Sequence, residues 1–216
     1  MKYPVFVQAL ALTIVVLIVG LYAGMSLEGS KLDNMNDYYI QSEVTLMDIL
    51  AFNNLIDTED VGCETLVKVN LDFMNRAYEE ASVLEEYEES GRLKENLDTF
   101  HKKYDVLRTF LWINVLKTKE VCEDTEIHTI VYLYNYEEED LTKKATQNVW
   151  SKVLLDVKEE KGDSLFLIPI ARDSELGSLE ALISEYDIGN YPAIIVNEEY
   201  VVTENVTKKN ILSLLE

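Results

Sequence analysis

Two cysteines, Cys63 and Cys122, are the side chains in this chain best suited to nucleophilic or redox chemistry. They lie 59 residues apart, so they do not form the C-x-x-C pair that is typical of thiol–disulfide exchange. No neighbouring base and no resolving cysteine is visible beside either of them in the sequence. Three interpretations therefore stay open: a structural disulfide, a pair of free thiols and a catalytic thiol.

A second candidate for chemistry is the run of four acids from Glu137 to Asp140, which follows an apolar, aromatic segment. We predict no metal site here, because adjacent helical positions point in different directions and no histidine joins the acids. Acids are favoured at the start of a helix, where they accept hydrogen bonds from free amide groups and meet the positive end of the helix dipole. His101 and His128 are isolated, and each is more typical of a surface or core residue than of a ligand.

The N-terminal segment indicates where this chemistry would take place. Val5 to Met25 comprises 21 residues without a charge. At about 1.5 Å per residue, such a helix spans the roughly 30 Å hydrocarbon core of a membrane. A cleaved signal peptide is the alternative, but its apolar region is usually only about 7–15 residues long. We therefore expect residues 1–27 to form an uncleaved, single-pass transmembrane anchor.

Charges near the anchor predict its orientation. Lys2 lies on one side, whereas Glu28 and Asp33 accompany Lys31 on the other. Basic residues favour the cytoplasmic side, so we expect the N-terminus in the cytoplasm and everything after Leu27 outside, at the cell membrane. The formal net charge of −21 argues against nucleic acid as a partner, because binding to phosphates depends on cationic contacts. The sequence has no phosphate loop, nucleophile elbow or zinc-ligand spacing, and we expect no cofactor.

Residues 28–125 are predicted to form a helical stalk with an antiparallel hairpin. Its two arms, Glu64–Glu89 and Leu93–Thr118, are each 26 residues long, and Gly91 between them suits a helix C-terminal cap. Equal antiparallel arms bring the open ends of the hairpin together, and the two cysteines lie at those ends. This arrangement favours a structural disulfide in an extracytoplasmic compartment. In the chain-entropy model such a bridge contributes up to about 4 kcal/mol.

Residues 126–216 alternate strand and helix patterns in the order β-α-β-α-β-β-α. This order requires a parallel pair of strands at its start and an antiparallel hairpin near its end. The predicted strands are Ile127–Asn135, Ser164–Ala171, Ala193–Val196 and Tyr200–Thr203, and the predicted helices begin near Leu141, Leu176 and Val206. We expect the first of these helices to bury an apolar stripe at every fourth position, formed by Leu141, Ala145, Val149, Val153 and Val157, with Trp150 and Leu154 widening it.

This order, with Tyr191 and Pro192 opening the third strand, resembles the thioredoxin superfamily in its minimal, glutaredoxin-like form, over residues 126–216. The whole layout also resembles archaeal membrane-anchored proteins that place a helical hairpin between a signal anchor and a thioredoxin-like domain. The implied fold class is α+β or α/β, with a transmembrane helix, an antiparallel coiled-coil-like stalk and a thioredoxin-like C-terminal domain. In this family a C-x-x-C follows the first strand, and the resemblance places Glu138 and Leu141 at the two cysteine positions. It also implies a cis peptide bond before Pro192.

Neither Glu138 nor Leu141 can carry out thiol–disulfide exchange, so the resemblance implies a redox-inactive domain and not an enzyme. We expect this domain to bind a protein partner, through a surface that favours a basic or extended peptide segment. The residues expected on this surface are Tyr134, Tyr136, Glu137, Glu138, Glu139, Asp140, Tyr191 and Ala193.

Two other functions stay open. The first is a thiol–disulfide oxidoreductase, or a subunit of one, that acts through Cys63 and Cys122 or through cysteines of a partner. The second is a structural component of the cell envelope. In addition, Asn205-Val206-Thr207 is an N-glycosylation sequon, and an extracytoplasmic compartment would permit its use.

Overall fold

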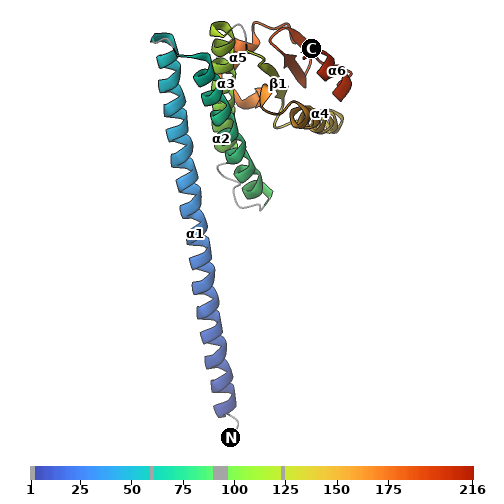
Figure 1. Cartoon of the computed structure of the whole chain (residues 1–216). Helices are drawn as coiled ribbons and strands as arrows, with labels where there is room; N and C mark the ends of the chain where they lie inside the picture. Colours follow the sequence, from blue (N-terminus) through green and yellow to red (C-terminus); the bar gives the residue numbers. More distant parts are fainter. Residues whose placement is uncertain (1–2, 59–60, 90–96, 123–124) are drawn as a thin grey trace. The chain divides into compact units, whose positions relative to one another are not determined.

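Figure 1 shows a computed structural model of the chain, which describes residues 3–58, 61–89, 97–122 and 125–216. The chain divides into two compact units, Met1–Met47 and Asp48–Glu216. The predicted boundaries at residues 27 and 125 do not coincide with a boundary between these units.

Helix α1 (Tyr3–Thr58) is one uninterrupted helix of 56 residues. Its segment Pro4–Gly24 has 21 residues with a mean hydropathy of 2.5, and none of that segment is buried. It is therefore long and apolar enough to cross a membrane, a property that a signal sequence at the same place would share. The predicted change from anchor to stalk near Leu27 is not marked by a break in the helix.

A mixed sheet of four strands forms the centre of the second unit. Its strands lie in the order β2-β1-β3-β4. Strands β1 and β2 are parallel, and the other two pairs are antiparallel. The strand bounds are β1 His128–Tyr134, β2 Leu165–Ala171, β3 Ala193–Val196 and β4 Tyr200–Val202. Asn197 and Glu198 both have positive φ in the turn between β3 and β4, as tight hairpin turns require.

Helices α4 (Leu141–Lys161) and α6 (Lys208–Ser213) cover one face of the sheet. Apolar side chains of these two helices pack there against alternate residues of the strands, such as Ile130 and Ile194, because successive strand residues point to opposite faces. The short helix α5 (Gly177–Ile183) follows β2. The predicted order of strands and helices after residue 126 is thus observed, with helix ends that differ by a few residues.

The apolar stripe predicted for α4 was wrong in its first half. Leu141 is 80% exposed and Val149 is 57% exposed. The residues of α4 that are buried are Gln147, Trp150, Leu154 and Val157. A step of four residues turns by about 40° more than a full helical turn, so positions 141 and 157 face directions about 160° apart. A single flat sheet cannot cover both.

Helices α2 (Cys63–Glu89) and α3 (Leu97–Val121) form the predicted antiparallel hairpin, and the disulfide between Cys63 and Cys122 is present, with Cα atoms 5.7 Å apart. On α3, Leu107, Leu111 and Asn114 follow one another at spacings of four and three residues, and all three are buried. The predicted turn at Ser90–Arg92 lies outside the described residues.

The hairpin also packs against the sheet domain. The rings of Trp112 on α3 and Tyr186, which follows α5, stack with centroids 5.8 Å apart. Lys119 of α3 forms a half-buried ion pair with Glu198 in the β3–β4 turn, with 2.6 Å between nitrogen and oxygen. The hairpin is therefore a layer of the second compact unit, a packing that the stalk prediction did not anticipate.

Side chains cover the outer edge of β2. The carbonyl oxygens of Leu165 and Leu167 accept hydrogen bonds from Lys158 Nζ and the Tyr78 hydroxyl. The amide of Ala171 donates to Asp105 Oδ1 at 3.0 Å. Positions 165, 167 and 171 alternate along β2 with positions whose backbone groups face β1. The one other position on the outer side, residue 169, is a proline and has no amide hydrogen. This edge therefore offers little to an additional strand.

Candidate functional site

The acidic run after β1 forms a turn and the start of α4. Asp140 is the N-cap of α4, and its Oδ1 accepts hydrogen bonds from the amides of Thr142 at 2.8 Å and Lys143 at 3.3 Å. These two bonds hold the pKa of Asp140 below its ordinary value. Helix capping, the role expected for acids at this position, is thus observed for Asp140.

Glu138 is part of the same turn and binds two other groups of that turn by hydrogen bonds. Its carboxylate accepts a hydrogen bond from the side-chain amide of Asn135 at 2.9 Å and another from the backbone amide of Asp140 at 3.0 Å. These bonds lower the pKa of Glu138. The first position at which the resemblance expects a cysteine therefore holds an anion that is already engaged with its own turn.

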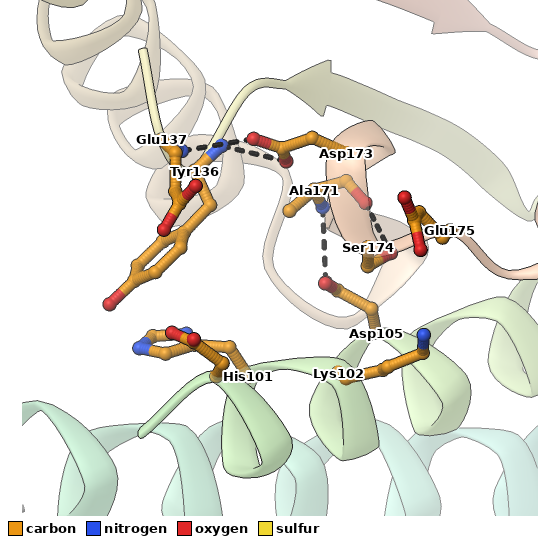
Figure 2. Close-up of a pocket in the computed structure, with 10 residues that line it drawn as sticks. His101, Lys102, Asp105, Tyr136, Glu137, Ala171, Asp173, Ser174 and Glu175 are labelled. Carbon is orange, nitrogen blue, oxygen red and sulfur yellow. Dashed lines mark hydrogen bonds between the residues drawn. The ribbon is translucent and has the colours of Figure 1, made fainter. Parts of the chain in front are cut away.

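A third carboxylate reaches the turn from the far end of β2. Asp173 lies in the short 3-10 helix Arg172–Ser174, and its two oxygens accept hydrogen bonds from the amides of Tyr136 and Glu137, both at 2.9 Å. Figure 2 shows this bidentate contact. The ends of β1 and β2 lie side by side because the strands are parallel and in register up to the pair Tyr134 and Ala171.

Leu141, the second expected cysteine position, is 80% exposed and carries no reactive group. The amides that could stabilise an anion at this turn are largely occupied by Asp173, Glu138 and Asp140. Thiol–disulfide exchange requires a thiolate, and neither of these two positions can supply one.

The segment before β3 contains the cis peptide bond that the resemblance implies. The peptide bond between Tyr191 and Pro192 is cis. Ala193 is fully buried and pairs with Leu133 of β1, so only its backbone could contribute to a surface near the acidic turn. Tyr191 is half-buried, and the guanidinium carbon of Arg172 lies 4.5 Å from the centre of its ring. That distance is typical of a cation–π contact.

Tyr134 is also largely withdrawn from the surface. Its ring stacks on that of Tyr132 with centroids 5.5 Å apart, and burial raises its pKa. Of the residues expected on the binding surface, Glu137, Glu139 and Asp140 are exposed, whereas Tyr136, Glu138 and Tyr191 are half-buried.

Beside the turn lies a hollow of about 320 Å³, between the start of α3 and the ends of β1 and β2. Figure 2 shows the residues that line it, with the ring of His101 facing that of Tyr136. The centroids of these two rings are 3.9 Å apart. The other lining residues are Asp98, Lys102, Asp105, Glu137, Ala171, Asp173, Ser174 and Glu175.

Asp105 forms the floor of this hollow and is only 2% exposed. Burial raises its pKa to about 6, although the hydrogen bond from the Ala171 amide and the nearby Arg108 guanidinium act in the opposite direction. The guanidinium nitrogen of Arg108 lies 3.7 Å from a carboxylate oxygen of Asp105. A buried carboxyl group with a raised pKa thus lies where the hairpin meets β2.

Sequence reasoning missed the contribution of α3 to this site. His101 was expected to be isolated, and Asp98, Lys102 and Asp105 had no pattern that distinguished them from a solvated helix face. The position of Asp173 could have been predicted. It follows a buried strand that was predicted to be parallel to the strand before the acidic turn, and the carboxyl ends of parallel strands meet at one edge of a sheet.

In the part of the chain that the structure describes, no group of three or more His, Cys, Asp or Glu residues has the geometry to hold a metal ion. Comparison of the chain with protein-family models, with curated proteins and with solved structures gives no match.

Proposed function

We propose that this protein is a single-pass membrane protein whose C-terminal unit is displayed outside the cytoplasm and binds another protein without catalysing a reaction. The bound element is an extended segment that carries basic side chains. The binding domain, residues 126–216, is a thioredoxin-like domain that has exchanged its redox site for a carboxylate-lined surface.

The order and direction of the strands support the thioredoxin-like fold. A parallel β1–β2 pair joined through a helix, followed by an antiparallel β3–β4 hairpin, gives the sheet order β2-β1-β3-β4. The cis bond before Pro192 opens β3 next to the end of β1. Fold alone does not determine function, so the proposal depends on the site that this fold carries.

One observation carries the noncatalytic function. Asp173 accepts hydrogen bonds from both amides at the start of the acidic turn, and Glu138 and Asp140 accept from the amides that follow. In an active member of the family the turn and helix amides would stabilise a thiolate. Here carboxylates of the chain itself accept hydrogen bonds from those amides in place of a thiolate, and the turn carries no thiol.

The surroundings of the turn favour a cationic partner. Asp98, Asp105, Asp173, Glu137 and Glu175 line the hollow against a single lysine, Lys102, and one histidine. The hollow of about 320 Å³ has room for one long side chain. A lysine or arginine of the partner would meet carboxylates there and the half-buried ring of Tyr136. Such an interaction weakens as salt increases.

The position of Lys2 and the Cys63–Cys122 disulfide support display outside the cytoplasm. Basic residues favour the cytoplasmic side of an anchor. Disulfides persist mainly in oxidising compartments.

Binding of a lysine-rich, extended peptide to the full chain in lipid nanodiscs tests this proposal. We expect binding that weakens from low to high salt and weakens further in Glu137→Gln and Tyr136→Ala. A matched control is Glu159→Gln, which neutralises an exposed acid near the opposite end of α4. Binding that is equally affected by Glu159→Gln, or that is insensitive to all three changes, contradicts a site at the acidic turn.

A further inference from the structure

The two edge strands of the sheet, β2 and β4, differ in how their outer sides are covered. The outer edge of β2 is covered by Lys158, Tyr78 and Asp105, and it contains Pro169. Strand β4 is the last strand on the other side, and no further strand pairs with it among the described residues. Tyr200, at its start, is 41% exposed. An open strand edge can pair with another chain, and proteins usually protect such edges.

The sequon lies directly after this open edge. Asn205 follows Val202, the last residue of β4, by three positions and is exposed. It adopts a positive φ of 55°, a backbone conformation that asparagine tolerates better than most residues. Its carbonyl oxygen accepts a hydrogen bond from the Asn210 side chain at 3.1 Å. No hydrogen bond within the described residues engages its side-chain amide.

The neighbours of Asn205 hold the loop in place. Val206 is 9% exposed and belongs to the core cluster. Thr207 is the N-cap of α6, and its hydroxyl accepts from the amide of Asn210 at 3.3 Å. The backbone on both sides of Asn205 is therefore anchored, while its side chain lies at the surface beside the end of β4.

We propose that Asn205 carries an N-linked glycan and that this glycan shields the open edge of β4. The inference rests on the proposed display of the C-terminal unit outside the cytoplasm. The donor is a lipid-linked sugar phosphate, and a membrane glycosyltransferase performs the transfer. The side-chain nitrogen of Asn205 forms a bond to the anomeric carbon of the sugar, the bond from that carbon to the phosphate oxygen breaks, the lipid phosphate leaves and the amide loses one proton.

A glycan suits this position physically. It is bulky and hydrophilic, and it occupies the solvent around its attachment point. Asn205 is three residues beyond the end of β4, so a glycan attached to it would occupy solvent near this edge.

Mass spectrometry of the full chain, purified from the membranes of its own cells, tests the modification. We expect a glycan mass on the peptide that contains Asn205, and loss of that mass in Asn205→Asp and in Thr207→Asp. Aspartate tolerates positive φ at position 205 and is a good N-cap at position 207, so both variants remove the sequon while retaining the local structure. Thr207→Ser retains both the sequon and the cap and is expected to retain the glycan.

Topology separates the two proposals. Unmodified Asn205 in a chain whose C-terminal unit is cleaved by protease added to intact cells would overturn the glycan and leave the proposed function standing. A C-terminal unit protected until lysis would overturn both.

Self-association of the protein tests whether the glycan shields the edge of β4. Sedimentation of the full chain in detergent should show more self-association for Asn205→Asp than for the glycosylated protein, and Tyr200→Lys in the same variant should reduce it. Asn148→Asp, an exposed change on α4, is the matched control and should have no effect. Equal self-association with and without the glycan would overturn the shielding role.

Discussion

The open end of the helical hairpin and the acidic turn after β1 are held by different kinds of bond. At the open end of the helical hairpin, a covalent bond joins Cys63 to Cys122 and ties α2 to the end of α3. At the turn after β1, where the proposed relatives carry their sulfur atoms, Asp173 and Glu138 bind the amides by hydrogen bonds. Sulfur thus joins the two ends of the hairpin, whereas carboxylates hold the turn at which the proposed thioredoxin-like fold would carry its redox site.

Removing the disulfide should give the largest effect on stability. The double variant Cys63→Ser, Cys122→Ser is expected to lower the free energy of unfolding by up to about 4 kcal/mol, because the unfolded chain is no longer constrained by the loop. Thermal unfolding of the full chain in detergent, followed by circular dichroism, measures this loss. Wild-type protein treated with reductant is the control and should lose a similar amount. An unchanged melting temperature would show that the bridge does not stabilise the fold.

The second effect concerns Asp105 and pH. Its pKa of about 6 in the folded protein lies above its ordinary value of 3.8, so the folded state binds this proton more tightly than the unfolded state. Its contribution to stability is therefore fully present below about pH 4 and is lost as the pH rises through about 6. Protonation of Asp105 thus adds about 3 kcal/mol to the free energy of unfolding at low pH, relative to high pH.

Asp105→Asn isolates this contribution, because asparagine still offers an oxygen to the amide of Ala171. The free energy of unfolding of the wild type minus that of the variant should fall between pH 4 and pH 7. A difference that stays constant over this range, measured by urea unfolding, would contradict a raised pKa at this position.

Asp173→Asn is expected to have a smaller effect, about 1–2 kcal/mol, because it replaces a charged bidentate acceptor of two amides by a neutral one at an exposed site. Amide hydrogen exchange should accelerate at Tyr136 and Glu137. Glu175→Gln is the matched control, since Glu175 also lines the hollow but makes no hydrogen bond to the turn. Equal protection of the two amides in Asp173→Asn and wild type would show that this carboxylate does not hold the turn.

Local sequence patterns predicted much of the sheet domain. The strand Ala193–Val196 has the predicted bounds, since its β-branched and apolar run lies between a proline and a tight turn. The disulfide was predictable because equal hairpin arms place both cysteines at one end. A capping role for the acids of Glu137–Asp140 followed from their place before a helical pattern, and the structure shows which of them, Asp140, is the N-cap.

Long-range packing was not predictable in the same way. The docking of α3 against β2 depends on contacts such as Asp105 with Ala171, which are far apart in the sequence and leave no periodic pattern. The hollow at the candidate site consequently could not be predicted, because α3 supplies one of its walls. The wrong stripe on α4 had a different cause, since a strict step of four residues drifts around a helix.

We propose that the acidic turn binds a partner without catalysing a reaction and that the two cysteines are structural. Reduction of insulin disulfides by the full chain in detergent, with a chemical reductant supplied, tests both parts directly. We predict a rate equal to that of the Cys63→Ser, Cys122→Ser variant and to that of reductant alone. Turnover by the wild-type protein above both controls would instead show an oxidoreductase that acts through Cys63 and Cys122 and would rule out a purely structural disulfide.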